Sequence, residues 1–288
     1  MRPLPLFLLI ACGGIVAITV NLSKAAARAG IEGPIFAFAL AAGSGLILLA
    51  STLAAGQRPR FDRAHVAYYL IAGLIGVAAP NLAAFAVAAN AGASYSALSY
   101  SLSPIFTYAI AIVMGTDAPS LRRGTGLLLG FLGTVAILHD MVAGAAGAGP
   151  FWALAALSVP ALLAAGNVYR SLRWPRNAEP LTLAAMMMLS AALWTLPALL
   201  AMAPDPAAAE PGGWAMVAAQ IALSALLYWL FFHLQREGGP VFLSQMGYVV
   251  AALGVPIAVF FFHESVSALV VAGLAAIVAG VVLVTPRP

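Results

Sequence analysis

Long apolar runs, separated by short polar or glycine- and proline-containing breaks, follow one another along the whole sequence. Most runs have about 20 residues, the length that a helix needs to cross the hydrocarbon core of a bilayer. The breaks predict ten transmembrane helices joined by short loops, with no room for an extramembrane domain. The expected helices are 4–24, 34–55, 65–89, 93–114, 122–139, 150–171, 180–203, 213–234, 239–262 and 266–285.

Two polar motifs occur twice, at an offset of about 147 residues, which indicates an internal duplication. The first is asparagine, a basic residue three positions later, and proline ten positions after that; the second is an acidic residue followed by serine and two glycines. The copies are Asn21, Lys24 and Pro34 with Asn167, Arg170 and Pro180, and Asp117, Ser120, Gly126 and Gly133 with Glu264, Ser267, Gly273 and Gly280. We therefore predict two five-helix repeats, 1–140 and 148–288. Because five is odd, the second repeat should be inverted relative to the first.

Composition supports a membrane protein, since 63% of the residues are hydrophobic and 8% are charged, against about 25% charged in soluble proteins. With a cytoplasmic N-terminus, every lysine and arginine except Lys24 and Arg28 falls on the cytoplasmic side. This bias predicts that both termini are cytoplasmic. The basic residues form no soluble cluster that would indicate nucleic acid. The sequence shows no phosphate-binding loop and no metal-ligand cluster, so we expect no cofactor and no metal.

Polar side chains inside a span are costly unless they find partners or line a wet cavity. Several such residues in the predicted spans share a helix face at spacings of three and four, and aromatic residues accompany them. This combination suits a small amphipathic ligand, although serines also allow close helix contact without any ligand. The predicted substrate-binding residues are Asn81, Ser96, Ser99, Tyr100, Ser103, Tyr228, Trp229, Gln245 and Tyr248.

Other residues are candidates for gating, coupling or motion. The duplicated motif makes Lys24, Asn167 and Arg170 gating candidates, but the favoured interpretation is that both basic side chains extend to the lipid headgroups. His233 is the candidate for proton coupling, and a structural hydrogen bond is its alternative. Prolines remove backbone hydrogen bonds, so they are candidate hinges or static bends. The candidate hinges are Pro80, Pro104, Pro160 and Pro256.

The segments from Ser103-Pro104 through Asp117 to Gly133, and from Pro256 through Glu264 to Gly280, resemble the drug/metabolite transporter superfamily, in particular its EamA type. Within it, the segments 100–104 and 246–248, with Tyr228-Trp229 before them, resemble the aromatic amino-acid exporters of the YddG type. The resemblance implies a multi-pass protein of the bacterial inner (plasma) membrane that exports amino acids, aromatic ones included, by alternating access.

Two other functions stay open at this point. One is export of drugs or other small metabolites by proton antiport; the other, of a different class, is a membrane enzyme or scaffold. The expected partners are a small-molecule substrate and the lipid bilayer. One chain holds both repeats, so a monomer is sufficient, and the small-residue faces of the fifth and tenth spans leave room for a homodimer.

Overall fold

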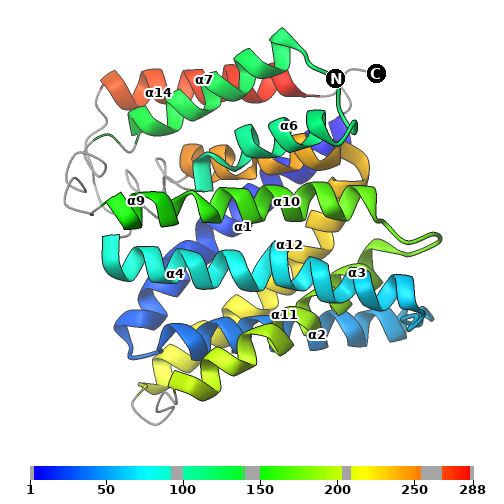
Figure 1. Cartoon of the computed structure of the whole chain (residues 1–288). Coiled ribbons are helices and arrows are strands. Elements are labelled where there is room, and N and C mark those ends of the chain that lie inside the picture. The colour runs from blue at the N-terminus through cyan, green and yellow to red at the C-terminus, as the bar shows by residue number, and fades with distance from the viewer. Residues whose placement is uncertain are drawn as a thin grey trace.

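The computed structural model describes residues 3–91, 100–137, 139, 150–202, 209–253 and 268–285. Within these ranges every regular element is a helix, which confirms the all-α prediction (Figure 1). The elements are α1 (Pro3–Arg28), α2 (Gly33–Ala54), α3 (Arg63–Gly73), the π-helix η1 (Leu74–Ala78), α4 (Ala79–Ala91), α6 (Ser103–Val113), α7 (Leu121–Ile137), α9 (Pro150–Ala156), α10 (Ser158–Leu172), α11 (Pro180–Met202), α12 (Pro211–Ser244) and α14 (Ala268–Val284).

Several helices are long and apolar enough to cross a membrane. Among the described residues these are α1, α2, α11, α12 and the continuous helix from Arg63 to Ala84, and α6 and α14 are shorter apolar helices. The multi-pass character therefore agrees with the sequence. The count of ten and the cytoplasmic position of both termini remain predictions.

Local chemistry sets where the helices begin. Asp62 precedes α3 and accepts hydrogen bonds from the N–H groups of Ala64 and His65, an N-cap that pairs otherwise free donors. The hydrogen bond from the His65 N–H is the main reason that the pKa of the Asp62 carboxyl is lowered. Proline stands in the first turn of α2, α6 and α12, where no N–H is needed.

The helix that begins at Arg63 changes from α to π geometry over Leu74–Ala78 and returns to α geometry immediately before Pro80. Pro80 has no N–H, so the α-helical bond to the Gly76 carbonyl cannot form. The Ala79 N–H instead bonds the Leu74 carbonyl, five residues back. This wider turn is the kind that recurs at functional sites.

Two other candidate hinges also lie at interruptions. Pro104 follows a turn at Leu102 and lies in the first turn of α6. Pro160 follows a turn at Leu157 that separates α9 from α10. Pro256 lies outside the described residues. The interruptions agree with the predicted loss of backbone hydrogen bonds, and their role as moving hinges remains a prediction.

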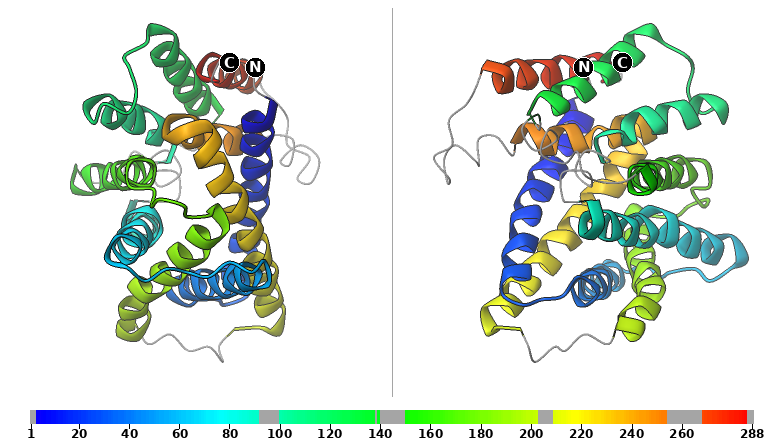
Figure 2. Two further views of the ribbon diagram at one scale, coloured as in Figure 1. Left: turned by 90° about the vertical axis from the view of Figure 1, so that its right-hand side faces the viewer. Right: turned by 60° about the vertical axis from the view of Figure 1, so that its left-hand side comes forward.

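Helix α12 differs from the expected span, which ended at residue 234. It stays helical through Gln235 and breaks at Gly239, whose φ of 73° and ψ of 177° are non-helical. Glycine tolerates this positive φ, and Pro240 starts the next helical segment. Figure 2 shows the two segments running in different directions. The polar residues at 235–237 had suggested a loop, yet Gln235 is buried.

Helices from distant parts of the sequence form the main pairs: α1 with α12, α2 with α11, and α7 with α14. Figures 1 and 2 show α7 and α14 side by side at one end of the molecule. In that pair Gly126 faces Gly280 and Gly133 faces Gly273, close to the opposing backbone. The small-residue faces that had suggested a homodimer are therefore used within the chain, between the last helices of the two repeats.

Candidate functional site

A buried arginine lies where helices of both repeats meet. Arg170 in α10 is 2% exposed. Its Nε donates to Gln235 Oε1 of α12 (3.3 Å), and its Nη2 donates to Asn167 Oδ1 (2.5 Å). The guanidinium carbon lies 5.0 Å from the centroid of the Phe231 ring, a cation–π geometry. The positive charge is thus held by amides and an aromatic face.

The expectation that Arg170 extends to the headgroups is wrong. Helical side chains tilt toward the N-terminus of their helix, so this one runs back along α10 toward Gly166. A Cβ added at Gly76 would collide with Nη1, and one added at Gly166 would lie 2.9 Å from the Gly76 Cα. Gly76 lies about 20 Å along its helix from Arg63, so the guanidinium lies far from that end of the helix. The two glycines leave the space that the guanidinium fills.

Two amides extend the network to a third helix. Asn167 Nδ2 donates to Thr107 Oγ1 of α6 (3.3 Å). Gln235 Nε2 donates to the Asn167 carbonyl oxygen (2.8 Å) and to Ser171 Oγ (2.6 Å). The gating candidate Asn167 therefore forms hydrogen bonds with Thr107 of the first repeat and with Arg170 of the second.

Tyrosines complete the surroundings of the guanidinium. Tyr68 of α3 and Tyr228 of α12 both interact with it electrostatically. Tyr68 is 1% exposed, its ring stacks on Tyr169 at 5.9 Å, and its hydroxyl has no hydrogen-bond partner among the described residues. The Tyr228 ring lies 5.7 Å from that of Phe231. We call Tyr68, Asn167, Arg170, Tyr228, Phe231 and Gln235 the arginine cluster.

Part of the predicted substrate site adjoins this cluster. The Tyr100 hydroxyl donates to Asn81 Oδ1 (3.4 Å), and Tyr100 interacts electrostatically with Tyr228. Ser103 is buried at the start of α6, and the fully buried Gln245 has no partner for either amide atom within the described structure. Ser96 and Ser99 lie outside the described residues. Asn81, Tyr100 and Tyr228 are therefore brought together beside Arg170.

The EamA-like transporter family matches this sequence over residues 4–139 and 150–285. The chain belongs to that family. The two matches confirm that the chain is duplicated and that it is a multi-pass membrane transporter for small molecules. Members of this family are transporters and not enzymes. No curated protein matches the sequence. A solved structure described as "Crystal structure of protein" is 18% identical, with a TM-score of 0.73 over 96% of each chain, and shows the likeness of the fold alone.

Two predicted residues of this EamA transporter lie on a different face of α12. Trp229 is 40% exposed, and its ring lies 5.2 Å from that of His233. His233 Nδ1 is 2.8 Å from the Trp229 carbonyl oxygen. Around the helix axis Trp229 is offset by about 100° and His233 by about 140° from Tyr228, so the structure does not bring them into the arginine cluster. The Lys24 side chain lies outside the described residues.

Tyr248 is fully buried, but it contacts α7 and not the arginine cluster. Its hydroxyl donates to the Leu127 carbonyl oxygen (3.0 Å), and a Cβ at Gly130 would collide with its ring. The hydroxyl that had been predicted to meet substrate is therefore engaged in a helix–helix contact.

We expect Tyr248→Phe to lower the stability of the transporter by about 1 kcal/mol and to leave the KM for substrate unchanged, because only the bond to Leu127 is lost. Thermal denaturation in detergent and flux in proteoliposomes measure the two quantities. A raised KM with unchanged stability would return Tyr248 to the substrate site.

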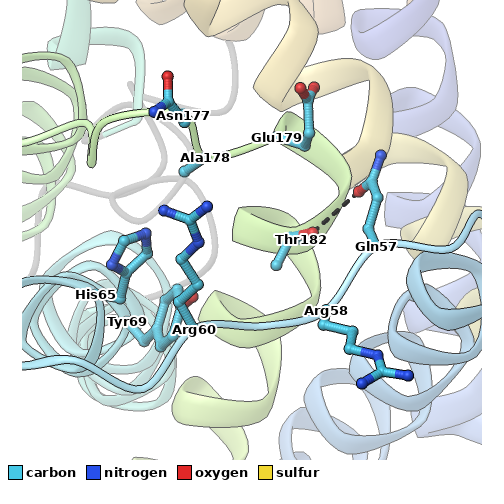
Figure 3. A pocket seen from close by; sticks show the side chains of 9 residues that line it. All are labelled: Gln57, Arg58, Arg60, His65, Tyr69, Asn177, Ala178, Glu179 and Thr182. Carbon is cyan, nitrogen blue, oxygen red and sulfur yellow. Dashed lines mark hydrogen bonds between the residues drawn. The ribbon is translucent and has the colours of Figure 1, made fainter.

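A separate polar cavity of about 170 Å³ lies at the ends of α2, α3 and α11 (Figure 3). Thr182 Oγ1 donates there to Gln57 Oε1 (3.0 Å), and His65 Nδ1 lies 2.6 Å from Asp62 Oδ2. In Figure 3 Arg60 points between His65 and Ala178. The cavity is smaller than the roughly 300 Å³ of typical ligand pockets. We assign it to the contact between these helix ends.

The sequence prediction missed Tyr68, Phe231, Gln235 and Gly76. Gln235 was placed beyond the end of a span, and Tyr68 and Phe231 look like ordinary apolar-face residues. The available signal was spacing, since Tyr228, Phe231 and Gln235 lie three and four apart, on one helix face.

Proposed function

We propose that this EamA transporter exports amino acids, aromatic ones included, from the bacterial cytoplasm across the inner membrane. The observation that supports this most is the arginine cluster with its neighbours Asn81 and Tyr100, to which both repeats contribute. Amide, hydroxyl and guanidinium groups suit the polar ends of an amino acid, and the surrounding rings suit an aromatic side chain.

Alternating access is the mechanism we propose. Two inverted repeats, 1–140 and 148–288, in a ten-helix body with both termini cytoplasmic, can exchange conformations and open to each side in turn. Pro80, Pro104 and Pro160 lie at helix interruptions, where bending breaks few hydrogen bonds. A monomer is sufficient for this cycle.

Facilitated export is the proposed mode. In the described part of the chain, each aspartate and glutamate lies in a loop or near the end of a helix. Proton antiport generally uses an ionisable group within the membrane, and His233 lies away from the arginine cluster.

Reconstitution in liposomes tests the proposal. Flux of labelled phenylalanine, tryptophan, threonine, methionine, a purine and a quaternary ammonium compound is measured with and without a pH gradient. We expect saturable amino-acid flux without the gradient. Flux of the cation alone, or only with the gradient, would replace this proposal by proton-coupled drug export.

Tyr100→Ala and Gln245→Ala should each lower kcat/KM for amino-acid flux about tenfold, the loss of one or two substrate hydrogen bonds. Leu226→Ala is the control, because Leu226 is 44% exposed on α12. Membrane insertion is compared by the yield of purified protein. Wild-type flux in both variants would remove Tyr100 and Gln245 from the site.

A further inference from the structure

The partners of Arg170 do not neutralise its charge. Its hydrogen bonds go to the neutral amides of Asn167 and Gln235, and none of the ion pairs found among the described residues includes it. A guanidinium that is 2% exposed inside a membrane protein normally pairs with an anion, because burial of an unpaired charge is costly. The cluster therefore favours an anionic ligand.

The unpaired atoms of the cluster are donors. Arg170 Nη1 is buried and has no hydrogen-bond partner, and the same holds for the Tyr68 hydroxyl, in the part of the chain that the structure describes. The two groups lie close enough to interact electrostatically. Two oxygens of one carboxylate can accept from two such donors. An ammonium group would place a second positive charge beside the guanidinium.

The backbone segments around Arg170 Nη1 can separate and so expose this atom to a ligand. Nη1 lies against Gly76 in the π-helical segment η1, and Gly76 lies against Gly166 of α10. With no side chain at either glycine, a small separation of the two backbones uncovers Nη1. The Phe231 and Tyr228 rings lie on the adjoining α12, where the apolar part of a ligand would meet them.

We propose that Arg170 binds the carboxylate of the transported molecule, with Nη1 and the Tyr68 hydroxyl as donors, so that the transporter selects small carboxylates and rejects cations without a carboxylate. This rests on the proposed function for the statement that the bound molecule is transported. The identity of the bound group follows from the cluster itself.

Four ligands that share a phenyl ring test the charge requirement with purified full-length protein in detergent. They are phenylalanine, 3-phenylpropionate, phenylalaninamide and phenethylamine, and binding is measured as the ligand-induced shift in melting temperature. Phenylalanine and 3-phenylpropionate should stabilise the protein, because both carry the carboxylate. For the amide and the amine, the concentration that gives the same shift in melting temperature should be at least tenfold higher.

Variants of Arg170 test whether this side chain causes the stabilisation by carboxylate ligands. Arg170→Gln should weaken binding of 3-phenylpropionate about 10- to 100-fold, the range for loss of charge-assisted hydrogen bonds. Arg170→Lys keeps the charge but not the planar donor geometry, so its loss should be smaller. Arg173→Gln is the matched control, because Arg173 is an exposed arginine at the end of the same helix.

The outcomes separate this inference from the proposed function. Equal stabilisation by phenethylamine and phenylalanine, or no stabilisation by any ligand, overturns the carboxylate site even where amino-acid flux is observed. Stabilisation by 3-phenylpropionate without any amino-acid flux overturns amino-acid export and supports the site. Should Arg170→Gln not fold, the ligand series on the wild type and on Arg170→Lys decides.

Discussion

Gly280→Leu is expected to reduce the yield of folded, membrane-inserted protein at least tenfold. A Cβ at Gly280 would lie 2.5 Å from the Gly126 carbonyl oxygen and 2.8 Å from the Gly130 nitrogen. These are backbone atoms of α7 and cannot rotate away, so α7 and α14 must separate. Overpacking of this kind costs about 3 kcal/mol or more. Size-exclusion chromatography of a fluorescent fusion protein measures the folded yield.

The control for this variant is Gly124→Leu in α7. Nothing lies within 4 Å of a Cβ at Gly124, so its yield should stay near that of the wild type. Equal yields of the two variants would show that the close contact of α7 with α14 is not needed for folding.

The second large effect is on transport. Gly76→Ala should lower kcat/KM at least tenfold while the melting temperature stays close to that of the wild type. The added methyl collides with Arg170 Nη1, and the end of a long side chain moves aside at low cost. A small displacement misaligns the guanidinium while its bonds to Asn167 and Gln235 persist, and alanine offsets part of the cost through its higher helix propensity, by about 0.5–1 kcal/mol.

Gly14→Ala is the matched control, since its Cβ would meet only Leu253 Cδ1, at 3.8 Å. Flux and thermal denaturation are measured for both variants. A Gly76→Ala protein with wild-type flux would show that the position of the guanidinium does not matter for transport. A large fall in its melting temperature would indicate a purely steric role for Gly76.

The close glycine contacts lie at two different places in the fold. The contacts between α7 and α14 join the last helices of the two repeats, and Arg122 reinforces them by donating to the carbonyl oxygens of Leu283 (2.6 Å) and Thr285 (2.8 Å). The Gly76–Gly166 contact instead lies at a π-helical interruption beside the arginine cluster. We expect the contacts between α7 and α14 to stay closed during transport and the Gly76–Gly166 contact to open.

The membrane class and the internal duplication are both readable from the amino-acid sequence, and the family match confirms them. Apolar runs of spanning length are readable because a bilayer demands about 20 apolar residues in succession. The duplication is readable because polar residues such as Asn167 and Arg170 stand out in an apolar background and recur at one offset. These signals also led to Asn81, Tyr100 and Tyr228, which the structure brings together.

The directions of those side chains depend on tertiary contacts and are not readable from the sequence. Arg170 is four residues from Gly166 but 94 from Gly76. Because neither glycine has a Cβ, the two positions leave the space that the buried guanidinium occupies. Tyr248 meets Leu127 of the other repeat, and Gln235 is buried because α12 continues to Gly239. The position of each of these side chains depends on the space and the hydrogen-bond partners that a segment distant in the sequence provides. Hydropathy, in contrast, depends on neighbouring residues along the chain and is therefore readable from the sequence.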